Sequence, residues 1–150
     1  MKVPSKWDYA HMETARNYAK LSSAKRAQVG AVIVKDNRII SIGYNGMPSG
    51  WDNCCETDIV DVRIDGESKV IGTQTRPEVI HAESNAITKV AKSSESSDGA
   101  SIYTTMLPCL DCAKLIYQAG INRVFYSDSY PKGTAGLEFL EKCSVEIIKL

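Results

Sequence analysis

Hydrophobic and polar residues along the chain follow two periods, one typical of strands and the other of helices. Two largely apolar runs within residues 29–46 flank a polar turn at residues 35–38 and predict a β-hairpin. Near the amino terminus, Ser5 and Asp8 form a capping pattern ahead of a loosely apolar face, which predicts a helix. From residue 47 to residue 75 no regular pattern is apparent, so we expect an irregular segment.

Beyond this segment the pattern becomes regular again. It predicts helices over about 78–92, 109–119 and 134–143, and strands over 101–106, 123–127 and 145–150. A strand, a helix and a second strand form a right-handed crossover with parallel strands, whereas a hairpin is antiparallel. We therefore expect one α/β domain over residues 1–150. It should be a three-layer α/β/α sandwich with a mixed five-stranded sheet, an antiparallel hairpin followed by a parallel half. In such sheets ligands bind beyond the carboxyl ends of the strands, where the following helices begin.

Composition and charge indicate which kind of ligand the protein binds and in which compartment it works. Lys and Arg total 18, as do Asp and Glu, so no overall positive charge would draw the chain to nucleic acid. A small molecule is therefore the expected ligand. The chain shows neither the pattern of a signal peptide nor a run long enough to span a membrane. We expect a cytoplasmic protein with no nucleic-acid or membrane partner.

Three residues at two predicted helix starts offer a set of metal ligands. His81 stands near the head of one helix, and Cys109 and Cys112 form a C-x-x-C spacing at the head of the next. One imidazole and two thiolates suit zinc, and three ligands leave the open position typical of a catalytic site. The alternatives are a four-ligand structural zinc or ordinary core residues. The second histidine, His11, is expected at the surface or in the core, and the lone Cys143 as a small buried hydrophobic residue.

Glu83 follows His81 by two residues, which is too close in sequence for a comfortable fourth ligand. A carboxylate in this place can face a water bound to the metal and move its proton, as a general acid and base. Without a metal nearby, Glu83 would be interpreted as a favourable charge in the first turn of a helix. We therefore expect Glu83 to be catalytic.

The segments HAE (81–83) and PCLDC (108–112) resemble the H-x-E and P-C-x-x-C signature of zinc-dependent nucleoside and nucleotide deaminases. The resemblance implies a cytidine deaminase-like fold. The block QVGAVIVKDNRIISIGYNGMPSGWDNC (28–54) resembles the deoxycytidylate (dCMP) deaminases in particular, through its GYNG and MPSG segments. Adenosine deaminases that act on transfer RNA usually lack this extended loop, and free cytidine deaminases generally carry cysteine in place of the motif histidine.

This resemblance implies hydrolytic deamination of dCMP to dUMP and ammonia, which would supply dUMP for thymidylate synthesis. It also implies that the backbone N–H of Ala82 meets the pyrimidine carbonyl and that Asn45 bonds the sugar 3′-hydroxyl. Arg26 is our candidate for the 5′-phosphate, because a guanidinium pairs bidentately with it. Tyr130 is our candidate to close over the base or phosphate. A deaminase of another nucleotide or nucleoside base, and a catalytically inactive zinc-stabilised binding module, stay open as alternatives.

The resemblance further implies a homo-oligomer, expected to be a hexamer, that dCTP activates and dTTP inhibits. The loop GYNGMPSGWDNC is longer than one mononucleotide requires, and its glycines leave backbone N–H groups free to face anions. We expect Lys25, Asn45, Gly46, Asp52 and Glu56 to contact the effector, with Mg²⁺ accompanying the triphosphate. Because no histidine occurs between residues 12 and 80, we expect one zinc per chain and no second, structural zinc.

Overall fold

The main sheet of the protein has five strands in the order β2-β1-β5-β6-β7, in a computed structural model that describes residues 3–150. The strands are β1 (Gly30–Lys35), β2 (Arg38–Tyr44), β5 (Ser101–Met106), β6 (Arg123–Asp128) and β7 (Glu146–Lys149). β1 runs antiparallel to β2 and to β5, whereas β5, β6 and β7 are parallel. The predicted mixed sheet is confirmed. Met1 and Lys2, which the predicted domain also includes, lie outside the described residues.

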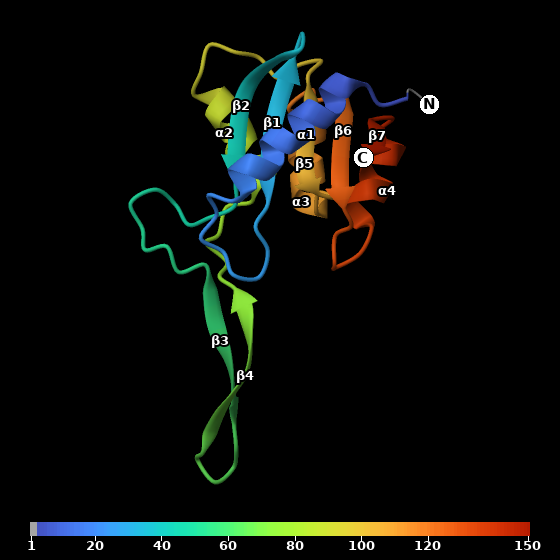
Figure 1. Cartoon of the computed structure of the whole chain (residues 1–150). Coiled ribbons are helices and arrows are strands. Elements are labelled where there is room, and N and C mark those ends of the chain that lie inside the picture. The colour runs from blue at the N-terminus through green and yellow to red at the C-terminus, as the bar shows by residue number, and fades with distance from the viewer. Residues whose placement is uncertain (1–2) are drawn as a thin grey trace.

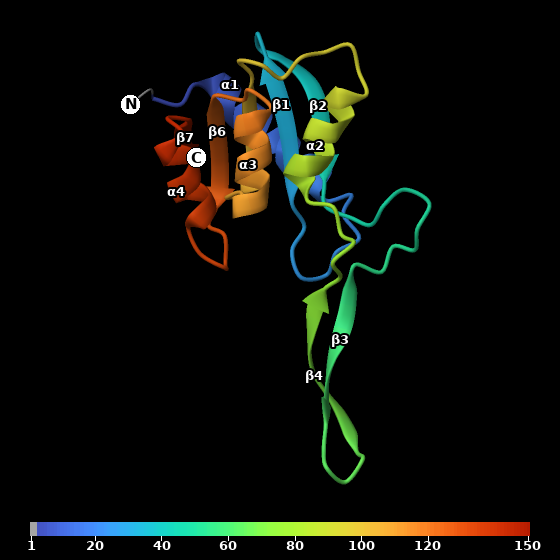
Figure 2. The same ribbon diagram turned by 180° about the vertical axis from the view of Figure 1, so that it is seen from behind.

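Helices cover both faces of this sheet, as Figures 1 and 2 show from opposite sides. Helix α1 (Lys6–Ala19) lies across one face. Helices α2 (Ala82–Ala91), α3 (Leu110–Gln118) and α4 (Ala135–Lys142) lie on the other. The arrangement is the three-layer α/β/α sandwich expected from the order of the elements.

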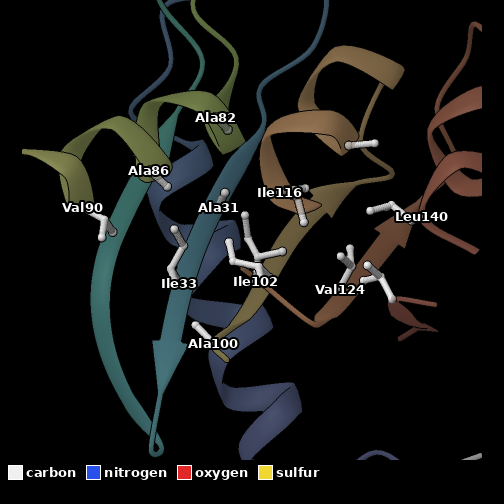
Figure 3. Close-up of a cluster of buried hydrophobic side chains, with 13 residues drawn as sticks. Ala31, Ile33, Ala82, Ala86, Val90, Ala100, Ile102, Ile116, Val124 and Leu140 are labelled. Atoms are coloured by element: carbon white, nitrogen blue, oxygen red, sulfur yellow. The ribbon is translucent and has the colours of Figure 1, made fainter. Parts of the chain in front are cut away.

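Two core clusters fill the spaces between these layers. The larger one lies between the sheet and helices α2, α3 and α4 (Figure 3), and it includes Ala31 and Ile33 of β1. Val32 and Val34 of the same strand belong to the second cluster, under α1. Successive side chains of a strand point to opposite faces, so β1 is buried on both sides and appears in the sequence as one continuous apolar run.

Gly43 in β2 lets helix α2 lie very close to the sheet. A Cβ atom at this position would be 2.2 Å from the carbonyl oxygen of Ala82 and 2.6 Å from the amide nitrogen of Ala86. Both atoms belong to the helix backbone, which cannot rotate away as a side chain can. The absence of a side chain at Gly43 therefore sets the depth at which the start of α2 lies.

The expectation of an irregular segment is wrong for residues 56–75. β3 (Glu56–Val62) and β4 (Ser68–Thr75) form an antiparallel hairpin that projects from the sandwich (Figures 1 and 2). Within the described part of the chain, neither strand contacts another helix or strand. Nearly all of their residues are exposed. A hairpin without a buried face needs no alternation of apolar and polar residues, which is the pattern that reveals strands in a sequence.

Backbone conformation explains one element boundary, and backbone hydrogen bonding explains another. Asp36 and Asn37 both have positive φ, as the two-residue turn between β1 and β2 requires. Helix α2 begins at Ala82 and not at about residue 78, a difference from the prediction. Gly46 and Ile80 exchange two backbone hydrogen bonds of 3.1 and 2.8 Å. The segment before α2 therefore pairs with the residues that follow β2 and is extended, not helical.

His11 and Cys143, for which the sequence predicted structural roles, both pack against other parts of the protein. His11 is buried, its ring lies against Tyr103, and its Nε2 is 3.0 Å from Oδ1 of Asn37. Cys143 is partly buried and packs against the larger core cluster. Across residues 3–150, no helix combines the length and the apolar character needed to cross a membrane.

Candidate active site

The amino-terminal ends of α2 and α3 come together close to the end of β5. His81 is the N-cap residue of α2, and Cys109 is the N-cap residue of α3, which follows β5 directly. Cys112 lies in the first turn of α3. One ligand atom from each of these residues lies within 4.8 Å of the other two. The structure therefore brings the three predicted metal ligands together.

The spacing of the three ligand atoms fits zinc. Nδ1 of His81 lies 3.5 Å from Sγ of Cys109 and 3.5 Å from Sγ of Cys112. In a tetrahedral site with bonds of about 2.3 Å to sulfur and about 2.0 Å to nitrogen, nitrogen and sulfur are roughly 3.5 Å apart. An imidazole with two thiolates also matches the chemical preference of zinc. His81, Cys109 and Cys112 can therefore hold this metal with a fourth position left for water.

The cluster favours a thiolate at Cys109 before any metal binds. Its pKa is lowered to about 4, because the Cys112 thiol donates a hydrogen bond to it and His81 lies beside it. The shared proton raises the pKa of Cys112, and the contact with Cys109 raises the pKa of His81. Since metal ligation also requires the second thiolate, zinc would displace the proton that the two cysteines share.

Glu83 is a charged residue in the interior, with only 4% of its surface exposed. It lies in the first turn of α2, and the hydroxyl of Thr104 in β5 donates to its carboxylate at 3.0 Å. Burial raises the pKa of Glu83. A buried carboxyl group whose pKa is raised holds a proton more tightly than an exposed one and can still pass it to a substrate, which suits a general acid and base.

A cavity of about 220 Å³ opens beside the metal-type cluster. His81 and Glu83 line it. The four residues predicted to bind the substrate line the same cavity: Arg26, Asn45, Ala82 and Tyr130. They come from segments far apart in the sequence, so their meeting could not follow from local spacing. His81, Glu83 and the four predicted substrate-binding residues therefore line one cavity.

The side-chain amide of Asn45 joins the end of β2 to the segment before β1. Its Oδ1 accepts a hydrogen bond from the N–H of Val29, and its Nδ2 donates to the carbonyl oxygen of Ala27, both at 2.8 Å. An amide oxygen has two lone pairs and an amide nitrogen has two hydrogens. Asn45 therefore retains one acceptor and one donor position for a ligand.

The base of the β3–β4 hairpin forms one wall of this cavity. Nη1 of Arg26 donates to the carbonyl oxygen of Thr73 at 2.9 Å. Oε1 of Glu56 accepts hydrogen bonds from the backbone N–H groups of Lys25 and Arg26, at 2.7 and 3.1 Å. Glu56 and Thr75 are among the residues that line the cavity.

The five residues predicted to bind an effector do not surround one cavity. Gly46 lines a second cavity of about 470 Å³. Asn45 and Glu56 line the first cavity instead. Lys25 and Asp52 line neither. The difference at Glu56 arises because the hairpin begins beside the backbone of residues 25 and 26, a contact that the expected irregular segment did not include.

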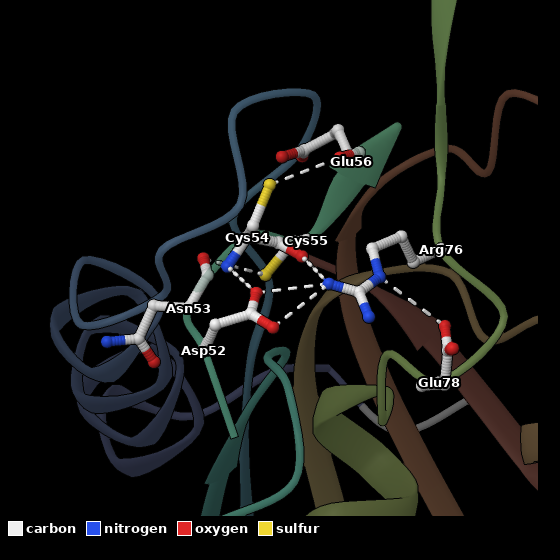
Figure 4. Close-up of polar contacts among 7 residues, drawn as sticks. All are labelled: Asp52, Asn53, Cys54, Cys55, Glu56, Arg76 and Glu78. Carbon is white, nitrogen blue, oxygen red and sulfur yellow. Dashed lines mark hydrogen bonds and ion pairs between the residues drawn. The ribbon is translucent and has the colours of Figure 1, made fainter. Parts of the chain in front are cut away.

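Asp52 belongs to a polar cluster centred on Arg76 (Figure 4). The Arg76 guanidinium donates to both carboxylate oxygens of Asp52, at 3.0 and 3.3 Å, and to the carbonyl oxygen of Cys54 at 3.1 Å. It also lies 3.5 Å from the carboxylate of Glu78. Hydrogen bonds from the N–H of Cys54 and from Arg76 lower the pKa of Asp52. The cluster fastens the loop before β3 to the segment that leads into α2.

Three residues of the site were not predicted in these positions from the sequence. Lys132 lines the cavity two residues after Tyr130, and its place beyond a parallel strand was the signal for it. Thr104 looked like any other residue of a buried strand. Glu56 reaches the cavity only through the hairpin, which left no periodic pattern.

Comparison with known proteins places the chain among its relatives. Residues 5–128 match the family described as the cytidine and deoxycytidylate deaminase zinc-binding region. The human deoxycytidylate deaminase is 39% identical over 158 residues, which cover 95% of this chain and 84% of that protein. The deoxycytidylate deaminase of Enterobacteria phage T4 is 34% identical over 153 residues, which cover 82% of this chain and 79% of that protein.

A solved structure shows the same fold. The dCMP deaminase of cyanophage S-TIM5, in complex with dCMP and dUMP, is 41% identical and has a TM-score of 0.85. The comparison covers 99% of this chain and 100% of that one, and it confirms the cytidine deaminase-like fold. The HAE and PCLDC segments that carry the ligands lie within the matched residues 5–128. The chain belongs to the cytidine and deoxycytidylate deaminase family.

Proposed function

We propose that this protein deaminates dCMP to dUMP with release of ammonia. The observation that carries the proposal is one cavity lined by His81 of the metal-type cluster, by the buried Glu83 and by Arg26, whose guanidinium suits a phosphate. Two relatives named above are deoxycytidylate deaminases, and the cyanophage enzyme was solved with dCMP and dUMP bound. These relatives support dCMP as the substrate.

The residues around the cluster would divide the chemistry among them. His81, Cys109 and Cys112 would hold a zinc ion, which supplies a bound water whose pKa is lowered to about 7. Glu83 would take a proton from the water as it adds to C4 and give that proton to N3 of cytosine. It would then move the proton of the new hydroxyl group to the amino group, which leaves as ammonia. The hydroxyl of Thr104 would hold the Glu83 carboxylate in place through its 3.0 Å hydrogen bond.

The rest of the cavity would recognise the nucleotide. Ala82 is the first residue of α2, so its N–H has no acceptor within the helix and is available for the pyrimidine carbonyl. Asn45 would bond the 3′-hydroxyl with the one donor and one acceptor position that its bonds to Ala27 and Val29 leave free. Arg26 would pair with the 5′-phosphate, and Tyr130 would close over the base or phosphate.

A substrate panel tests the assignment of the phosphate group. Arg26→Ala should lower kcat/KM for dCMP by about 10- to 100-fold, since a charge-assisted hydrogen bond contributes roughly 1.5 to 3 kcal/mol. Turnover of deoxycytidine should change little. Arg63→Ala, which removes the same charge from the far end of the hairpin, is the matched control. Equal losses on both substrates would remove Arg26 from the phosphate site, and zinc-loaded protein that deaminates neither would support a binding module.

Regulation and assembly belong to the same proposal. We infer a homo-oligomer, a hexamer, that dCTP activates and dTTP inhibits in the presence of Mg²⁺, and whose dUMP feeds thymidylate synthesis. The second cavity supports an effector site, because Gly46 lines it while the neighbouring Asn45 lines the first. A ligand there would be one peptide bond from a substrate contact. Saturation curves for dCMP that neither triphosphate shifts, from a protein that sediments as a monomer, would refute this part.

A further inference from the structure

Two consecutive backbone N–H groups at the wall of the first cavity point at one oxygen. The donors are the amides of Lys25 and Arg26, and the acceptor is Oε1 of Glu56, at 2.7 and 3.1 Å. Successive amides directed at one point form a concave site suited to an anion. Arg26 also lines the first cavity, and its guanidinium, which donates to Thr73, adds a positive charge to the segment that carries this amide site. In this structure its occupant is a carboxylate of the protein itself.

The carboxylate is brought there by the hairpin. Glu56 is the first residue of β3 and lies opposite Thr75, the last residue of β4. Arg26 contacts the same hairpin, through the carbonyl oxygen of Thr73. Both Glu56 and Arg26 line the first cavity, as His81 and Glu83 do. The position of Glu56 beside the amides is therefore fixed by the base of the hairpin.

A substrate phosphate would compete with this carboxylate. An ionised carboxylate and a phosphate are both acceptors without protons to share, so the two amides cannot satisfy both. Two anions this close also repel, by about 1 kcal/mol at 4 Å in water and about 4 kcal/mol where the effective dielectric constant is near 20. One of them must leave when the other binds.

We propose that Glu56 is a specificity-determining residue that holds the phosphate position closed until a 5′-phosphate displaces it. This inference rests on the proposed function, since it takes the nucleotide phosphate to bind beside Arg26. Displacement lowers the affinity for dCMP below what the amides and Arg26 alone would give. A nucleoside without phosphate leaves Glu56 in place. Glu56 thereby limits the preference for dCMP over deoxycytidine.

Glu56→Gln isolates the charge, because the glutamine oxygen can still accept from both amides and keep residues 25–26 in place. KM for dCMP should fall about tenfold with kcat unchanged, a size that lies between the two estimates above. KM for deoxycytidine should change less than twofold. Asp61→Asn removes the same charge from a residue of β3 that does not line the cavity, and should leave both KM values unchanged.

A second variant separates this role from a structural one. Glu56→Ala removes the acceptor as well as the charge and empties the amide site. If Glu56 only holds the backbone of residues 25–26, both variants will raise KM for dCMP or leave it unchanged, and the proposal is overturned. If Glu56 blocks the phosphate position, both variants will lower it.

Inorganic phosphate gives a test that does not depend on turnover. Calorimetry should show tighter binding of phosphate to Glu56→Gln than to the natural protein, by about tenfold. Equal or weaker binding overturns the proposal. Natural protein that deaminates neither dCMP nor deoxycytidine would refute the proposed function, while this phosphate measurement would still decide the role of Glu56.

Discussion

Gly43→Ala tests whether the depth of helix α2 sets the chemistry at its first turn. The added Cβ would lie 2.2 Å from the carbonyl oxygen of Ala82 and 2.6 Å from the amide nitrogen of Ala86. Ordinary contacts to a Cβ begin at 3.4 Å, so α2 must move away from β2 by about 1 Å. Helix α2 carries Glu83 and has His81 as its N-cap residue, so both would move with it.

The expected losses follow from that displacement. Forcing one extra carbon into a close-packed contact costs about 1 to 3 kcal/mol of unfolding free energy. Displacing a catalytic group by about 1 Å costs roughly 10²-fold in rate, because the reacting atoms no longer meet in the productive geometry. The rate should therefore fall much more than the folded fraction does.

Urea unfolding, zinc content and dCMP turnover measured on the same preparation distinguish these effects. The control is Gly72→Ala, where the added Cβ would meet only the end of the Ile59 side chain, at 3.8 Å. The control should keep its activity. If Gly43→Ala deaminates dCMP at the natural rate with unchanged stability, the contact between Gly43 and α2 does not set the position of Glu83, and the reasoning fails.

Three further predictions concern single residues. Glu83→Gln should keep its zinc but lose roughly 10² to 10⁴ in rate, since a positioned acid–base group contributes that much; loss of zinc would show instead that Glu83 is a ligand. Cys112→Ala should lose zinc by atomic absorption, because two protein ligands hold the metal poorly, while Cys143→Ala should retain it. Burial and the 2.7 Å hydrogen bond to Asp8 raise the pKa of Tyr103. The folded state thus resists ionisation, so unfolding free energy should fall as pH rises above about 10. Tyr103→Phe should flatten that fall in urea titrations, and an unchanged slope would contradict the assignment.

How much could be predicted from the sequence depended on whether the signal was local. His81, Cys109 and Cys112 lie at helix starts with fixed spacing, so their chemistry was visible without the fold. The antiparallel hairpin and the parallel half of the sheet followed from the order of strands and helices along the chain. The hairpin could not be predicted, because strands without a buried face leave no periodic signal. The place of Glu56 could not be predicted either, because its contacts with Lys25 and Arg26 join residues 31 and 30 positions apart.

The projecting hairpin divides the molecule into parts that should open at different free energies. A two-stranded sheet with no third element is marginally stable in water, and here Val62, Ile64 and Ile71 are exposed rather than packed. Amide hydrogens of β3 and β4 should exchange with solvent through local opening, whereas those of β1 should exchange only when the whole domain unfolds. The wall formed by Glu56 and Thr75 thus belongs to the hairpin, whereas the metal ligands lie at helices that pack on the core of the sandwich. Mild denaturant should lower the affinity for substrate well before it releases zinc.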